Sequence, residues 1–115
     1  MVRNESLDPK VDFENNTYIY PNPITGETAN FVIFSPFQSR VKMKIYTMNG
    51  DLILDKDFGD TPANQYVIDQ NGFVWNRKNQ AGRRVARGLY YAVIRAEETL
   101  GGKNLMQTVK RFLIK

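Results

Sequence analysis

The chain has 115 residues, 42% of them hydrophobic and 24% charged, proportions that fit one globular domain with its own core. It contains no histidine and no cysteine, which excludes the commonest general base, the commonest transition-metal ligand and any disulfide. The net charge of +4 is uneven, because residues 1–76 carry a net −4 and residues 77–115 a net +8.

The first part of the chain is divided by prolines. Residues 1–16 are polar and show no sustained period, so we expect a flexible lead-in or linker, with at most a short edge strand at 11–13. A strand pattern at 17–20 then meets Pro21, Asn22 and Pro23. The two prolines fix φ and lack a backbone donor, so they end the strand in a rigid turn. Residues 29–34 form the next expected strand.

The clearest alternation in the chain lies at 41–47. Val41, Met43 and Ile45 fall on one face and the intervening residues on the other, as in a half-buried strand. Asn49-Gly50 follows between apolar runs and predicts a type I′ hairpin turn, which needs positive φ at both positions. Residues 51–58 are therefore the expected returning strand.

The stretch from Trp75 to Val93 is the expected centre of the domain. Its single tryptophan ends one strand and is the expected core anchor, because indole buries more apolar area than other side chains. Gly88 opens the next strand at 89–97. A last strand at 105–114 follows a glycine hairpin, and its uneven parity predicts a bulge near residues 110–111.

About seven short strands at regular spacing, with no helical period, predict an all-β fold. We expect an antiparallel β-sandwich, with residues 1–16 outside it and residues 17–115 inside it. No apolar run approaches the roughly 20 residues that cross a bilayer, so no transmembrane segment is expected.

Catalysis, cofactors and metals find little support in these residues. Every acidic side chain falls in a turn, the lead-in or an exposed strand position, so we expect no enzyme and no bound cofactor. Asp55, Asp57 and Asp60 offer oxygen ligands for Ca²⁺, but their spacing differs from an EF-hand loop and Lys56 interrupts them. We interpret them as solvated charges that protect a strand and its turn, and expect no metal site.

A nucleic-acid interface is the alternative that the basic half raises. Cations at 83, 84, 87, 110, 111 and 115 could neutralise phosphates, and Tyr90 and Tyr91 could stack on bases. Neighbouring residues of a strand point to opposite faces, however, so at least one tyrosine must point inward. We therefore expect no nucleic-acid partner.

Four motifs occur in register along most of the chain. They are PNPITG at 21–26, IYTMNG at 45–50, the series Trp75, Gly82 and Gly88-Leu89-Tyr90, and VKRFLIK at 109–115. Together they resemble the type A C-terminal sorting domain of the bacterial type IX secretion system. They are also similar to the related immunoglobulin-like domain of the flagellar hook-cap protein.

The resemblance implies an immunoglobulin-like sandwich that sits last in a secreted protein, behind an N-terminal cargo domain. Such a domain passes through the periplasm and is recognised by the outer-membrane export machinery. A sortase then removes it and leaves the cargo at the cell surface. The matching positions in this chain, which are the candidate recognition residues, are Pro21, Asn22, Pro23, Gly50, Gly88, Tyr90, Lys110 and Lys115. Cleavage is expected before Thr17, and an open edge strand is the expected docking surface.

One position departs from the hook-cap pattern, in which Asp-Gly follows the tryptophan. Here Asn76-Arg77 follows, and arginine does not take positive φ cheaply, so a different turn is expected after Trp75. Two other functions remain open. One is a structural spacer or assembly module of the hook-cap type. The other is a glycan-binding accessory domain, which would need Trp75 and the tyrosines on an exposed platform.

Overall fold

The computed structural model describes residues 8–115. This part of the chain contains nine strands and one short helix, joined by loops. In chain order they are α1 (Pro9–Asn15), β1 (Tyr18–Tyr20), β2 (Ala29–Val32), β3 (Phe34–Ser35), β4 (Ser39–Thr47), β5 (Leu52–Thr61), β6 (Gln65–Tyr66), β7 (Phe73–Trp75), β8 (Gly88–Glu98) and β9 (Leu105–Ile114).

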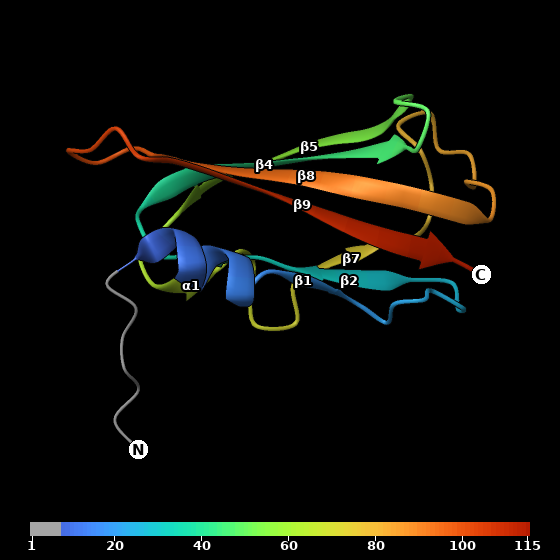
Figure 1. The fold of residues 1–115 in the computed structure, drawn as a ribbon, viewed down its shortest axis with the longest axis horizontal. Coiled ribbons are helices and arrows are strands. Elements are labelled where there is room, and N and C mark those ends of the chain that lie inside the picture. Colours follow the sequence, from blue (N-terminus) through green and yellow to red (C-terminus); the bar gives the residue numbers. More distant parts are fainter. Residues whose placement is uncertain (1–7) are drawn as a thin grey trace, which may run out of the picture.

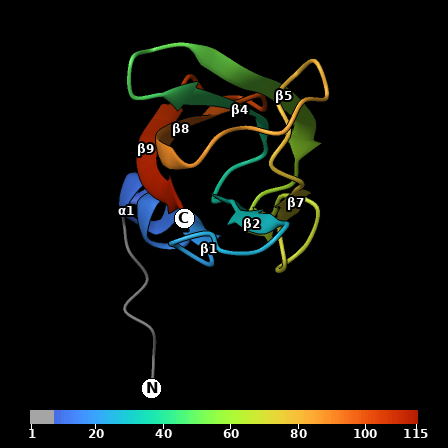
Figure 2. The same cartoon turned by 90° about the vertical axis from the view of Figure 1, so that its right-hand side faces the viewer.

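The strands form two main layers. One is a four-stranded sheet in the order β5-β4-β8-β9, and the other a three-stranded sheet in the order β1-β2-β7; the short β3-β6 pair makes a third sheet. Figures 1 and 2 show the larger sheet stacked over the smaller one. All strand pairs are antiparallel, which confirms the all-β sandwich. There are more strands than expected, partly because the run at 29–34 divides into β2 and β3, which join different sheets.

The core lies between the two layers. Val41, Met43 and Ile45 of β4 are each 0% exposed, so the predicted alternation of that strand is confirmed. Phe31 of the smaller sheet meets Phe112 of the larger sheet at 5.6 Å between ring centroids, nearly perpendicular. Trp75 lies 5.9 Å from both rings and is 2% exposed. Edge-to-face contacts of this kind add about 0.5–1.5 kcal/mol each beyond area burial. The aromatic residues therefore join the layers at the centre.

The helix corrects the expectation for the start of the chain. The Asp8 side chain accepts a hydrogen bond from the Lys10 amide at 3.0 Å, and Pro9 occupies the first helical turn, where its missing donor costs nothing. Phe13 is 0% exposed and belongs to the core cluster. Residues 11–13, where a short edge strand was considered, are helical instead, and residues 9–15 pack against the core through Phe13. The rest of the expected lead-in, residues 1–7, lies outside the described part of the chain.

Two local predictions about turns and bulges are also wrong. Gly50 has φ +91°, but Asn49 keeps a negative φ, and the Gly50 amide donates to Thr47 O at 2.9 Å. The hairpin therefore turns by a type I geometry followed by a left-handed glycine, not by type I′. The β8–β9 register runs without a shift, so β9 has no bulge. Val109 simply faces solvent, 51% exposed.

Truncating Phe13 tests whether α1 belongs to the folded unit. Phe13→Ala should lower the free energy of unfolding by about 3–5 kcal/mol, because it leaves a cavity where a fully buried ring stood. Val11→Ala on the same helix, where Val11 is 43% exposed, should stay within about 0.5 kcal/mol of the wild type. Urea unfolding measures both. Equal, small effects would show that the helix is detached in solution.

Candidate recognition site at the C-terminal corner

Most of the candidate recognition residues gather at one end of the sandwich. Gly88 pairs with Ile114 and Tyr90 with Phe112, so the start of β8 lies beside the end of β9. The turn with Gly50 lies at the same end, near the C-terminus in Figure 1, since Thr47 pairs with Tyr90. We define the C-terminal corner as residues 21–24, 88–90 and 111–115.

The proline turn lies along the outer edge of β9. The Asn22 side chain pairs with that edge as a strand would: its Nδ2 donates to Arg111 O at 3.3 Å, and Leu113 N–H donates to its Oδ1 at 3.1 Å. Ile24 continues the pairing, donating to Leu113 O at 2.7 Å and accepting from Lys115 N–H at 2.9 Å. The peptide bonds before Pro21 and Pro23 are both cis. This end of β9 is therefore covered, and the open edge expected as a docking surface is not open here.

The opposite edge of the same sheet is covered in a similar way. The backbone N–H of Gln80 donates to Ile53 O at 2.9 Å, and the Gln80 side-chain oxygen accepts from Asp55 N–H at 3.0 Å. One residue of the 76–87 loop thus satisfies two outward groups of β5 through its backbone and its side chain. Edges blocked in this way resist pairing with other chains, so at these positions the faces of the sheet are accessible and its edges are not.

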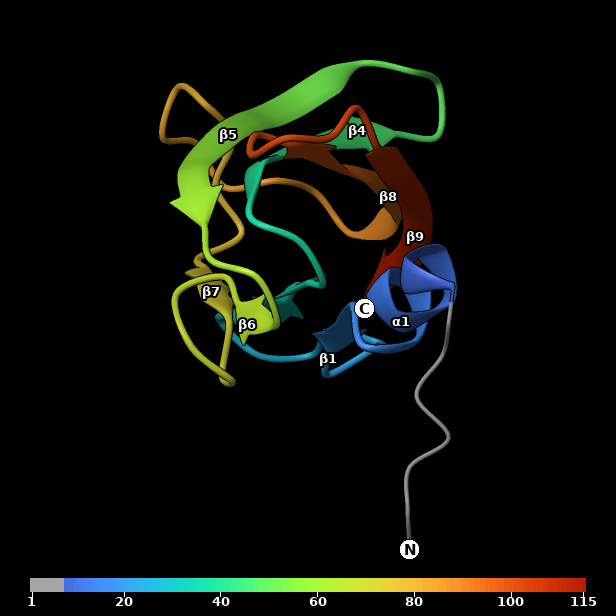
Figure 3. The ribbon, with the colours of Figure 1, turned by 90° about the vertical axis from the view of Figure 1, so that its left-hand side faces the viewer.

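Two of the candidate residues point into the molecule rather than out of it. Tyr90 is 5% exposed, its hydroxyl donates to Ala86 O at 2.5 Å, and its ring stacks on Phe112 at 5.7 Å. This burial raises the pKa of Tyr90. Figure 3 shows β9 beside α1, and there Lys110 Nζ donates to Glu14 O at 2.9 Å. Both side chains support the fold, whereas Lys115 is exposed.

Arg77 overturns the expectation for the turn after Trp75. It adopts φ +62°, the left-handed region that was expected to exclude it. Its side chain is buried at 7% exposure and donates from Nη1 to Gly26 O at 2.7 Å. Beside it, Arg84 forms an ion pair with Glu27 at 2.6 Å. Together these contacts hold the 76–87 loop against residues 26–27, and the buried hydrogen bond offsets part of the backbone strain.

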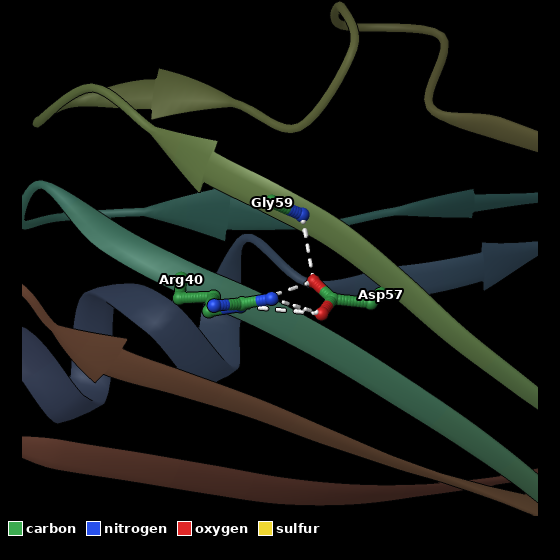
Figure 4. Close-up of polar contacts among 3 residues, drawn as sticks. All are labelled: Arg40, Asp57 and Gly59. Atoms are coloured by element: carbon green, nitrogen blue, oxygen red, sulfur yellow. Dashed lines mark hydrogen bonds and ion pairs between the residues drawn. The ribbon is translucent and has the colours of Figure 1, made fainter.

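The outer face of the four-stranded sheet contains a shallow hollow of about 730 Å³. Basic and acidic side chains line it together, and the firmest contact joins Arg40 to Asp57 at 2.7 Å (Figure 4). Asp57 also accepts from the Gly59 amide at 2.9 Å, at the bulge where β5 slips against β4. The Arg40 hydrogen bond first, and the Gly59 hydrogen bond second, lower the pKa of Asp57.

The alternatives raised by the sequence meet specific obstacles. Tyr90 is buried and Arg84 is paired with Glu27, so neither is free for nucleic acid. Trp75 is buried, and its indole N–H donates to Lys78 O at 2.9 Å, so it cannot form a glycan platform. Among residues 8–115, no three acidic side chains come together as metal ligands. The helix within this range is too short and polar to cross a membrane.

The fold and the corner define an antiparallel β-sandwich with a covered C-terminal strand. No protein-family model matches the chain, and no curated protein matches it. Parts of two solved structures are similar to the chain. PorZ, an essential surface component of the type IX secretion system of Porphyromonas gingivalis, is 20% identical with a TM-score of 0.53, over 92% of this chain and 12% of that chain. Dimeric latent PorU from the same organism is 20% identical with a TM-score of 0.61, over 86% of this chain and 9% of that chain. At this identity the likeness shows the fold, and this chain matches a small part of each larger protein.

Replacing Asn22 tests its contact with β9. In Asn22→Ala the Leu113 amide loses its acceptor, so its hydrogen exchange should accelerate by about 2–10-fold, the equivalent of one hydrogen bond. Asn22→Asp keeps an oxygen at that place and should retain most of the protection. Amide exchange followed by NMR reports both variants. Unchanged protection of Leu113 in Asn22→Ala would mean that the turn does not hold the strand.

Removing the Arg40 guanidinium tests the cause of the Asp57 shift. In Arg40→Gln the pKa of Asp57 should rise toward its ordinary value, while Lys44→Gln on the same strand should leave it nearly unchanged. Because the folded-state pKa is lowered, this contact stabilises the protein above the ordinary carboxyl pKa. The stabilisation disappears as pH falls through the folded-state pKa. An NMR titration of the Asp57 carboxyl carbon measures the shift, and an identical midpoint in wild type and Arg40→Gln would refute its cause.

Proposed function

We propose that this chain is a non-catalytic sorting domain, which directs a larger secreted protein to the type IX export machinery and to the cell surface. The observation that carries the proposal is the convergence of its motifs. The PNP turn precedes the Gly-Leu-Tyr start of β8 by about 65 positions and the last residues of β9 by about 90, yet all three meet at one corner. A shared location for scattered motifs is what a recognition site requires.

The comparisons add support of a coarser kind. This chain resembles a small part of PorZ, and PorZ is a bacterial surface component of the type IX secretion system. The match to about a tenth of that chain fits a module attached to a larger protein, here the N-terminal cargo domain. The choice of a sorting role over other roles of the same fold rests on the corner itself, because fold alone does not assign function.

In this proposal the inward face of β9 stabilises the fold and its outward face contacts the receptor. Its inward side chains hold the sandwich together, while Arg111 and Lys115 remain exposed for a receptor of the outer-membrane machinery. Cleavage is expected in the linker before Thr17, and in this proposal it falls upstream of α1, because a cut within 9–15 would break the helix that holds Phe13 in the core.

A spacer or assembly module is the second candidate. It is favoured by one observation, that the fold recurs as 12% and 9% of two longer chains, where a small domain can simply separate larger ones. The two candidates differ in what a fusion does. A spacer carries no export information, whereas a sorting domain moves an unrelated protein.

A reporter fusion separates these functions. Residues 1–115 are placed behind a periplasmic signal peptide and a fluorescent protein, in a bacterium that carries a type IX secretion system. We expect the reporter at the cell surface or in the medium, accessible to added protease in intact cells. The same fusion in a strain that lacks the secretion pore, and a reporter without the domain, should both remain periplasmic. A wild-type fusion retained in the periplasm of the competent strain would refute the sorting role.

A further inference from the structure

The outward faces of β8 and β9 form a surface that the sandwich leaves unpartnered. In an antiparallel sheet the solvent face normally carries polar residues, yet here Leu89 is 54% exposed and Val109 51% exposed. Leu89 pairs with Leu113, and Val93 with Val109, so these side chains are neighbours. Tyr91 lies between the two pairs and stacks on Tyr46 of β4, with the rings 5.2 Å apart. We define the apolar outer patch as Leu89, Tyr91, Val93, Val109 and Leu113.

The other half of the same face differs in kind. There the charges compensate one another, because Arg40 bonds Asp57 and lies opposite Glu97, and Lys42 lies opposite Asp57. Leu105 is a lone apolar residue in this half, paired with Glu97. The contrast matters because a contiguous apolar patch on an otherwise charged sheet marks an interaction surface, whereas scattered apolar residues do not.

The cations of β9 and of the C-terminal end of the apolar outer patch have no such compensation. Arg111 pairs across the strands with Tyr91, and its neighbours two residues away on the same face are Val109 and Leu113. Within residues 8–115, no ion pair forms at Arg111, or at the exposed Arg87 and Lys115, which flank the paired residues Gly88 and Ile114. An apolar surface with basic side chains along the β9 edge and at its C-terminal end is complementary to an apolar surface rimmed by carboxylates.

We propose that the apolar outer patch is the docking surface for a partner protein that presents an apolar surface rimmed by acidic side chains. This inference rests on the proposed function, in which the partner is the receptor of the export machinery. The patch begins at the C-terminal corner, because Leu89 follows Gly88 and Leu113 precedes Ile114. A partner protein can therefore bind the C-terminal corner through the apolar outer patch, since the edge of β9 is covered.

Two other occupants fit the patch less well. A second copy of this chain would bring the same surface onto itself, so that Arg111 would meet the cations of its twin without an acidic partner. A glycan would need free aromatic faces, but Tyr46 and Tyr91 stack on each other and the rest of the patch is aliphatic. An acidic-rimmed protein satisfies both the apolar area and the charge.

Matched substitutions in the exported reporter fusion test the inference. Leu89→Asp and Val109→Asp place a carboxylate in the patch, and each should lower the rate of surface appearance at least about tenfold, as expected for the centre of an interface. Leu105→Asp is the control, since Leu105 is 51% exposed on the same face of β9 but lies in the charged half. It should change the rate less than about twofold. Thermal unfolding of the purified domains should show similar midpoints for all of them, and Leu89→Gln replaces Leu89→Asp if that midpoint falls.

The outcomes separate the two proposals. If the wild-type fusion is not exported, the sorting function fails. If it is exported and the patch variants match its rate, the sorting function stands and the docking surface is refuted. Sedimentation of the purified domain supplies a further check. A dimer that Leu89→Asp dissociates would identify a second copy as the occupant, and would also overturn the proposal.

Discussion

The contact between Phe31 and Phe112 joins the two sheets of this domain at the centre of its core. Phe31 belongs to the smaller sheet and Phe112 to the last strand of the larger one, and Trp75 packs edge-on against both at 5.9 Å. Rings that meet in this way bury a large apolar area and fix the orientation of the layers. Because Phe112 lies within the final motif of the chain, the end of the sequence is a structural component and not an appendage.

This constraint explains how the last strand can serve two purposes. Alternate side chains of β9 point to opposite faces, so Phe112 and Ile114 enter the core while Arg111 and Leu113 face outward. The turn at Asn22 then covers the edge, which leaves the outer face as the accessible part of the motif. In the proposed function, a receptor that binds this face binds only the folded domain, since the positions of the outward side chains depend on the inward ones.

The sequence predicted the features that follow from periodicity, including the sandwich and the alternation of β4. It missed α1, because a helix of seven residues with one buried position shows no period; the signal that could have located it is Asp8 before Pro9, a helix cap followed by proline. At the site, the proline turn and the start of β8 were found as motifs. The pairing of Asn22 with β9, the buried Arg77 and the exposed patch at Leu89 depend on contacts across the fold, which no local pattern encodes.

We expect the C-terminal corner to open only when the whole domain unfolds, because its turn is bonded to β9 and β9 is packed into the core through Phe112. Native-state hydrogen exchange tests it at two protons: the amide of Ile24, which donates to Leu113 O at 2.7 Å, and the indole N–H of Trp75, which donates to Lys78 O at 2.9 Å. Their exchange free energies should both equal the free energy of global unfolding measured with urea. If the Ile24 amide exchanges through a much cheaper local opening while the Trp75 indole remains protected, the end of the chain is a separable tail and the account is contradicted.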